Sequence, residues 1–287
     1  MSKIIPDQCQ IIHITYQHAP NKSWSQAFGK LTEVDIPVTA DTAIALPLLI
    51  QACRDLLTDK RRAEFKLRFE KLKAKHDAQR KQWQAIAAAD GDKSPITLPW
   101  MAKQVWEAVK NDDWALVNEA LGGNGWGRRL WDWDKPYQYV SWPGLAGGLS
   151  HSIGAALAHK QYHRLCVDFQ ADGDFLYLPS ALWTAAHYQI PMLVVMNNNR
   201  AYYNIENHQR MLSKIRERQF NEKGIAARFD DPYIDYANLA RSFGLFGVGP
   251  IDKPQDLLPA LKEAVKFIKE KGQLALVDVV TRPNPAQ

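Results

Sequence analysis

Residues 169–204, FQADGDFLYLPSALWTAAHYQIPMLVVMNNNRAYYN, contain two apolar segments that each end in polar residues. The first segment ends at Asp172, and the second ends at three consecutive asparagines, Asn197, Asn198 and Asn199. Aspartate and asparagine are poor strand residues and are costly to bury without hydrogen-bond partners. The pattern predicts a strand, a helix and a second strand whose polar ends lie in a functional site.

The neighbouring segments indicate the fold class. Residues 164–170 (RLCVDFQ) and 191–197 (PMLVVMN) are nearly continuous apolar runs, which is typical of parallel strands buried on both faces. A third strand is predicted at 274–283. Helical patterns occur between and before these strands, at 98–112, 150–161, 233–244 and 256–271. This alternation predicts an α/β fold, a doubly wound and mostly parallel sheet with helices on both faces, over about residues 95–287.

The N-terminal third has a different pattern. Residues 10–16 predict a short buried strand, and Asp41 or Thr42 can cap a helix that runs to about Leu57. A long, strongly basic helix is predicted next, over 58–89. We therefore expect three parts: residues 1–57, too small for a complete domain, a helical linker over 58–94, and the α/β domain over 95–287.

Composition excludes several classes of protein. The chain has 287 residues and 46% hydrophobic residues, but no apolar run long enough for a membrane span and no secretory signal pattern. Its three cysteines are far apart, which fits a reducing cytoplasm. The net charge of +5 comes with acidic residues at helical spacing in the basic helix, which favours a solvated helix over a nucleic-acid-binding one.

The two polar strand ends predict a metal site. Asn199 follows Asp172 by 27 residues (172 to 199), about the length of a turn, a helix and a strand. Because ligands bind beyond the carboxyl ends of parallel strands, a carboxylate, an amide oxygen and a nearby carbonyl can meet there. Such oxygen ligands suit Mg²⁺, and Gly173 allows the backbone to approach a phosphate. The alternative is that these residues are helix caps and turn residues.

The same stretch resembles the cofactor motif of thiamine-diphosphate-dependent enzymes, GDG followed a little under thirty residues later by NN. The resemblance is to the diphosphate-binding domain of the acetolactate synthase, benzoylformate decarboxylase and pyruvate decarboxylase superfamily, and it covers about 95–287. Two further segments are similar to segments of the family and occur in the same order along the chain. They are the glycine-rich segment GLAGGLSHSIGAALAHK (144–160) and the segment DPYIDYANLARSFGLFGV (231–248).

The resemblance implies a set of site residues. It makes Asp172, Asn199 and the carbonyl of Ala201 the Mg²⁺ ligands, and Leu145 the apolar residue under the bend of the cofactor. The remaining implied cofactor-binding residues are Pro143, Gly144, Gly147, Gly148, Gly173, Asp174, Ala201 and Tyr202. Two positions depart from the family pattern: Ala171 replaces the first glycine, and Asp174 replaces a small hydroxyl residue.

The resemblance also implies a missing part. Family members have a pyrimidine-binding domain that carries the activating glutamate, and nothing before residue 95 matches it. Residues 1–57 resemble the tail of the family's central domain. We therefore expect a separate pyrimidine-domain chain or a missing domain, and a homo- or hetero-oligomer.

Three functional hypotheses follow. The first is the Mg²⁺- and thiamine-diphosphate-binding portion of a lyase or transferase that acts on a 2-keto acid or related carbonyl compound and is inactive as an isolated chain. The second is a non-catalytic cofactor-binding or assembly module of the same fold. The third is a different doubly wound nucleotide-binding protein. It is disfavoured because the sequence contains neither a GxGxxG nor a GxxxxGK[ST] motif. His151 and Glu206 are weak catalytic candidates.

Overall fold

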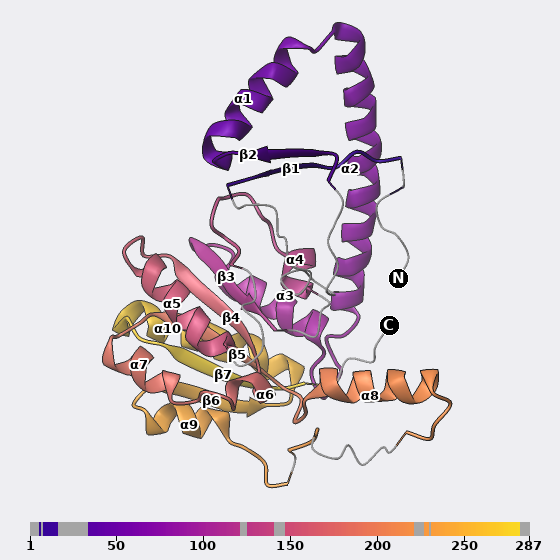
Figure 1. Cartoon of the computed structure of the whole chain (residues 1–287). Coiled ribbons are helices and arrows are strands. Elements are labelled where there is room, and N and C mark those ends of the chain that lie inside the picture. The colour runs from indigo at the N-terminus through magenta and orange to yellow at the C-terminus, as the bar shows by residue number, and fades with distance from the viewer. Residues whose placement is uncertain are drawn as a thin grey trace. The chain divides into compact units, whose positions relative to one another are not determined.

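The chain divides into two units, residues 1–75 and residues 76–287. The computed structural model describes residues 6, 8–16, 34–120, 125–140, 147–220, 227–229 and 231–281. The division lies inside the long helix α2 (Asp59–Ala88), which the basic pattern predicted (Figure 1). The structure groups the second half of α2 with the α/β domain. The division into three parts that the sequence suggested remains a prediction.

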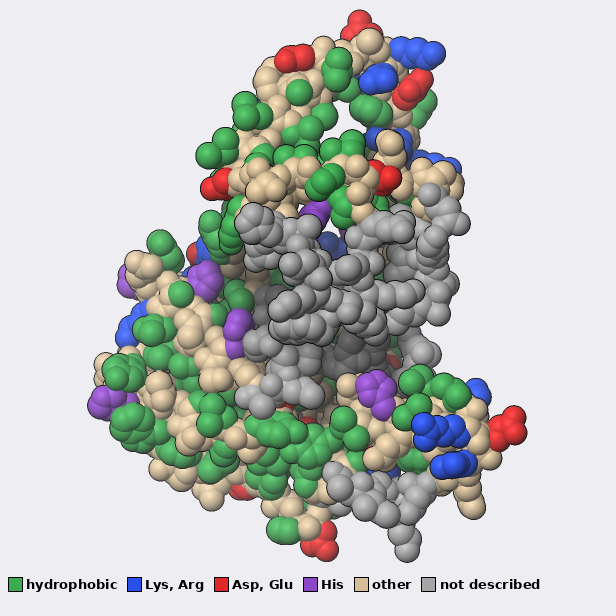
Figure 2. All heavy atoms as spheres, viewed as in Figure 1, with side chains coloured by type: hydrophobic (Ala, Val, Ile, Leu, Met, Phe, Trp, Pro, Cys, Tyr) green, Lys and Arg blue, Asp and Glu red, His purple; other side chains and the backbone are tan. Residues whose placement is uncertain are grey.

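The N-terminal unit contains a two-stranded parallel sheet and a helix. Strands β1 (Ile12–Thr15) and β2 (Ile36–Thr39) pair in parallel, and α1 (Thr42–Asp55) follows. The Asp41 carboxylate accepts a hydrogen bond from the Ala43 amide, as the capping pattern predicted. The prediction that the first strand is buried was wrong. Ile12 is 56% exposed, and no described residue of this unit is buried; Figure 2 shows apolar side chains of the unit at its surface.

A five-stranded parallel sheet forms the centre of the C-terminal unit. Its spatial order is β3-β4-β5-β7-β6, and every neighbouring pair is parallel. The strands are β3 (Trp114–Glu119), β4 (Leu165–Ala171), β5 (Met192–Asn198), β6 (Phe246–Ile251) and β7 (Ala275–Val280). The predicted parallel sheet and its strands β4, β5 and β7 are confirmed. The sequence analysis missed β3 and β6.

Helices cover both faces of this sheet (Figure 1). One layer contains α3 (Leu98–Val109), α4 (Trp126–Leu130) and α10 (Pro254–Lys271). The other layer contains α5 (Gly148–Lys160), α7 (Ala181–His187) and α9 (Tyr236–Ser242). Two further helices begin just after β4 and β5, namely α6 (Asp172–Phe175) and α8 (Tyr203–Ile215). No helix among the described residues is both long and apolar enough to span a bilayer.

Alternation along the strands builds two cores, one on each face. In β4, Leu165, Val167 and Phe169 face the layer of α3 and α10, whereas Cys166 faces the layer of α5. Trp131 extends the first core, 1% exposed and 5.0 Å from the ring of Trp114. Both faces of the central strands are thus covered by helices. The polar residues Asp172 and Asn199 follow the carboxyl ends of β4 and β5.

Candidate functional site

Asp172 lies immediately after β4 and begins α6. Its carboxylate is buried and accepts hydrogen bonds from the Gly173 amide at 2.8 Å and the Arg200 amide at 2.6 Å. Burial raises the pKa of this carboxyl to about 7, although the amides of Gly173, Arg200 and Asn199 oppose the shift. Asp172 is therefore a carboxylate held in place by neutral donors, at the carboxyl end of the sheet.

Asn199 and Ala201 lie on the loop that follows β5. The Asn199 amide oxygen accepts a hydrogen bond from the Ala201 amide at 3.0 Å, and Ala201 pairs with Arg228 in an antiparallel bridge. Between them, Arg200 adopts a left-handed backbone conformation with φ of 60°. Arg200 is also the residue whose amide donates a hydrogen bond to the Asp172 carboxylate. The structure thus brings together the two segments that the spacing predicted to meet.

The turn at 172–174 is also attached to the start of α5. The Asp174 carboxylate accepts hydrogen bonds from the Gly148 amide at 3.1 Å and from the Gln170 side chain at 3.2 Å. A Cβ atom at Gly148 would lie 2.2 Å from the Asp174 carboxylate, so only glycine allows this approach. Gly147 precedes it as the N-cap of α5. The implied residues Gly147, Gly148, Gly173 and Asp174 therefore do lie around one turn.

Tyr202 lies across the backbone of Gly173. A Cβ atom at Gly173 would lie 2.5 Å from the Tyr202 ring, which explains the need for glycine here. The Tyr202 ring also packs against Phe229 with ring centroids 5.2 Å apart, and against Tyr177 at 5.9 Å. Burial is the main cause that raises the pKa of the Tyr202 hydroxyl. The three rings form an aromatic cover beside the turn.

A row of buried polar side chains crosses the sheet near this site, and the sequence analysis missed it. Asn118 on β3 donates to Asp168 on β4 at 2.8 Å, and Asn198 on β5 donates to Asp278 on β7 at 2.9 Å. Burial raises the pKa of Asp168 to about 8 and that of Asp278 to about 7. The signal was present in the sequence, since each aspartate interrupts an apolar strand.

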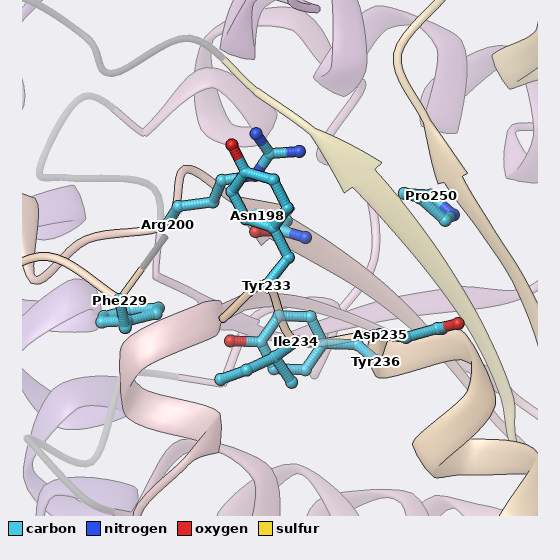
Figure 3. Close-up of a pocket in the computed structure, with 8 residues that line it drawn as sticks. All are labelled: Asn198, Arg200, Phe229, Tyr233, Ile234, Asp235, Tyr236 and Pro250. Carbon is cyan, nitrogen blue, oxygen red and sulfur yellow. The ribbon is translucent and has the colours of Figure 1, made fainter. Parts of the chain in front are cut away.

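A cavity of about 150 Å³ adjoins the asparagine loop (Figure 3). The Arg200 guanidinium lies 4.0 Å from the centre of the Tyr233 ring. The buried Tyr236 hydroxyl has no hydrogen-bond partner among the described residues. The lining residues are Asn198, Arg200, Phe229, Tyr233, Ile234, Asp235, Tyr236 and Pro250. Of these, sequence reasoning singled out only Asn198. Arg200 lies on the same loop, whereas the others belong to segments that the fold brings here.

The weak catalytic candidates have other surroundings. Glu206 on α8 is 4% exposed and accepts hydrogen bonds from Arg210 at 3.1 Å and from Arg228 at 3.3 Å. Glu206 therefore links α8 to Arg228, the residue that pairs with Ala201, and this role is structural. His151 lies on α5, and its buried Nε2 atom has no hydrogen-bond partner among the described residues. The implied residues Pro143, Gly144 and Leu145 lie outside the described residues.

Comparison with known proteins gives a family for this arrangement. A family described as "Thiamine pyrophosphate enzyme, C-terminal TPP binding domain" matches residues 122–279, which is more than half of the chain. The chain belongs to this thiamine pyrophosphate enzyme family. The match contains the turn at 172–174, the asparagine loop, the strands β4, β5 and β6, and all of β7 but its last residue. The family resemblance inferred from the motif is therefore confirmed.

Relatives of known name are similar over most of this chain. The Escherichia coli K12 acetolactate synthase isozyme 3 large subunit is 24% identical over 259 residues, covering 88% of this chain and 41% of that protein. A probable acetolactate synthase large subunit of Methanococcus aeolicus is 23% identical over 271 residues, covering 92% of this chain and 42% of that protein. The chain thus spans about two fifths of the length of these two acetolactate synthase subunits.

Solved structures share the fold. The thiamine diphosphate-dependent 4-hydroxybenzoylformate decarboxylase of Rhodococcus jostii RHA1 matches with a TM-score of 0.54 and 23% identity, covering 68% of this chain and 34% of that one. Benzoylformate decarboxylase from Polynucleobacter necessarius matches with a TM-score of 0.55 and 15% identity, covering 66% and 34%. Both support the doubly wound architecture of a thiamine pyrophosphate enzyme C-terminal domain.

Proposed function

We propose that this chain binds Mg²⁺ and thiamine diphosphate with the turn at 172–174 and the loop at 199–201. The observation that carries the proposal is the 2.6 Å hydrogen bond from the Arg200 amide to the Asp172 carboxylate. It joins the two predicted ligand segments at the carboxyl ends of β4 and β5, where parallel sheets bind ligands.

The residues present fit a divalent cation. Asp172 is 1% exposed and has no ion pair among the residues that the structure describes, so a bound cation would offset the cost of burying its charge. The Asn199 amide and the Ala201 carbonyl supply neutral oxygen ligands, which Mg²⁺ accepts.

The residues also fit a diphosphate group and its surroundings. Thiamine diphosphate, when bound, supplies a nucleophilic carbon and an electron sink next to a substrate carbonyl. Asp172 and Asn199 would hold the metal that neutralises the phosphates, and Gly173, which has no side chain, lets the Tyr202 ring pack against the turn. Tyr202 and Phe229, both half-buried, pack against each other beside the turn and reduce its contact with water.

The activity that this site supports best is cleavage or formation of a carbon–carbon bond next to the carbonyl of a 2-keto acid or related compound. The support is the family and its named relatives, which are acetolactate synthases and decarboxylases. We propose that a pyrimidine domain, on the same protein or on a partner chain, completes the site, and that residues 1–57 belong to a central domain. The isolated chain would then be inactive, and the assembled enzyme would be a cytoplasmic oligomer.

Isothermal titration with thiamine diphosphate tests the binding proposal. We expect the intact chain to bind it only with Mg²⁺, and Asp172→Ala to weaken binding by about a hundredfold or more, because a metal ligand is lost. Asp92→Ala, which removes an exposed carboxylate from the turn after α2, is the matched control and should bind as the unmodified chain does. Equal affinity for all three chains, with and without Mg²⁺, would refute the proposed metal bridge.

A further inference from the structure

Tyr236, the first residue of α9, is a buried tyrosine with an unpaired hydroxyl. Its side chain is 1% exposed, and its hydroxyl makes no hydrogen bond to any residue that the structure describes. Leaving a buried hydroxyl unpaired costs free energy, so such a group normally bonds to the protein or to an ordered water. The Tyr236 hydroxyl therefore requires a partner other than the described protein groups.

The Tyr236 side chain adjoins both segments of the proposed metal site. Its ring packs edge-to-face against Phe175, the last residue of α6, with ring centroids 5.5 Å apart. It also lines the cavity of Figure 3 together with Asn198 and Arg200, on either side of the proposed ligand Asn199. One side chain of α9 is thus next to both the turn at 172–174 and the asparagine loop.

Charge interactions indicate where the Tyr236 hydroxyl lies. Burial is the main cause that raises its pKa, and the Asp172 carboxylate is the next cause, followed by Asp278 and Tyr202. Charge interactions weaken with distance, so Asp172 is the carboxylate that acts most strongly on this hydroxyl. The tip of the Tyr236 side chain therefore lies near the proposed metal ligand, although no direct hydrogen bond joins the two groups.

The surroundings of Tyr236 suit an ordered water molecule. The cavity that it lines has a volume of about 150 Å³, and one water occupies about 30 Å³ of the liquid. A second unpaired atom belongs to Asp278, whose Oδ2 is buried without a partner among the described residues while Oδ1 accepts from Asn198 at 2.9 Å. Water both donates and accepts, so it can join a phenol to carboxylates that lie beyond direct hydrogen-bond distance.

We propose that the Tyr236 hydroxyl positions the Asp172 carboxylate for metal binding through one ordered water, which accepts from the hydroxyl and donates to the carboxylate. This inference rests on the proposed function and adds a positioning residue that acts on the metal only through Asp172. The carboxylate already accepts from the Gly173 and Arg200 amides, which leaves lone pairs for the water and the cation. A third hydrogen bond restricts the rotation of the carboxylate, and such outer hydrogen bonds change metal affinity by about 10- to 100-fold.

A single-atom deletion tests the proposal. Tyr236→Phe removes the hydroxyl and keeps the ring, and Tyr162→Phe makes the same change at a tyrosine that is 65% exposed, as the matched control. The full chain and both variants are melted without ligand to establish folding. Thiamine diphosphate is then titrated by calorimetry at a series of Mg²⁺ concentrations, and Mn²⁺ titration followed by electron paramagnetic resonance measures metal binding directly.

We expect Tyr236→Phe to need about tenfold more Mg²⁺ or Mn²⁺ for half-saturation, but to bind thiamine diphosphate normally once the metal is saturating. Its melting temperature should stay within about 3 °C of the unmodified chain, because the ring keeps its packing. Tyr162→Phe should match the unmodified chain throughout. A residue that only supports the packing of α9 does not produce a loss confined to metal binding.

The other outcomes separate this inference from the proposed function. If the unmodified chain binds metal and cofactor and Tyr236→Phe has the same metal dependence, the inference is wrong and the proposed function stands. Weaker cofactor binding that persists at saturating Mg²⁺ also refutes the inference, because it indicates damage to the whole pocket. If the unmodified chain binds neither Mg²⁺ nor thiamine diphosphate, the proposed function and the inference fail together.

A crystal structure of the unmodified chain supplies a measurement that does not depend on the variant. We expect one water within hydrogen-bond distance of both the Tyr236 hydroxyl and the Asp172 carboxylate. A Tyr236 hydroxyl that bonds elsewhere would overturn the inference.

Discussion

Leu48 on α1 and Leu276 on β7 show how differently the two units of this molecule use the same residue type. Leu48 is 66% exposed in the N-terminal unit, and Leu276 is 0% exposed in the C-terminal unit. The contrast is general, because no described residue before His76 is buried, while the five-stranded sheet has a buried core on each face. Apolar residues are abundant in both units, so composition does not explain the difference.

The explanation is the number of layers. Parallel strands are normally buried on both faces, and a sheet of only two strands has little stability of its own. The pair of β1 and β2 offers apolar surface, at Ile36 and Val38 among others, that needs further strands and helices to cover it. This exposed apolar surface of the described residues supports our proposal that the N-terminal unit belongs to a larger central domain.

The largest effect should come from the core of the sheet. We expect Leu276→Ala to lower the free energy of unfolding by about 4 kcal/mol, because it removes buried methyl groups and leaves a cavity in the core between the sheet and the layer of α5, α7 and α9. Urea denaturation followed by tryptophan fluorescence measures this change. A loss below about 1 kcal/mol would show that the two-sided core contributes less than its burial indicates.

A smaller, pH-dependent effect should come from Asp168. Burial raises the pKa of its carboxyl to about 8, against 3.8 as the ordinary value, so the folded chain keeps a proton that the unfolded chain releases. The stability contributed by this group is complete below about pH 4 and decreases by up to about 1.4 kcal/mol per pH unit until about pH 8. The N-terminal unit has no buried group of this kind among its described residues.

Asp168→Asn should therefore become the more stable chain as the pH rises. Asparagine cannot ionise and keeps an oxygen that accepts from Asn118. Between about pH 5 and pH 8 we expect its unfolding free energy to increase relative to the unmodified chain by about 3–4 kcal/mol. Urea denaturation across this range measures the difference, and parallel pH profiles for the two chains would show that Asp168 is charged in the folded state.

The smallest effect should come from the matched change in the other unit. We expect Leu48→Ala to change the unfolding free energy of the sheet domain by no more than about 0.5 kcal/mol, because its side chain is exposed. The denaturation assay used for Leu276→Ala applies here, combined with size-exclusion chromatography. A loss of several kcal/mol would mean that α1 is covered in solution, and a dependence on protein concentration would identify the cover as a second copy.

Local patterns were sufficient for much of the fold. Continuous apolar runs identified β4, β5 and β7, and capping residues marked helix ends such as Asp41 and Gly272, whose φ is 65°. β6 was missed because its sequence, FGVGPI, contains two glycines and a proline, all poor strand residues. It forms a strand through parallel pairing with β7, and Gly247 lets the α9 backbone approach closely, since a Cβ at 247 would lie only 2.1 Å from the Ala237 carbonyl.

For the site, the sequence by itself determined that Asp172 and Asn199 end successive strands, because strand length and helix length set that spacing along the chain. Only the tertiary structure decided that Asp174 faces the start of α5, that Tyr202 covers Gly173, and that β7 lies between β5 and β6. The physical reason is range. Periodicity and capping depend on residues a few positions apart, whereas the direction of a side chain depends on segments that only the folded sheet brings into contact.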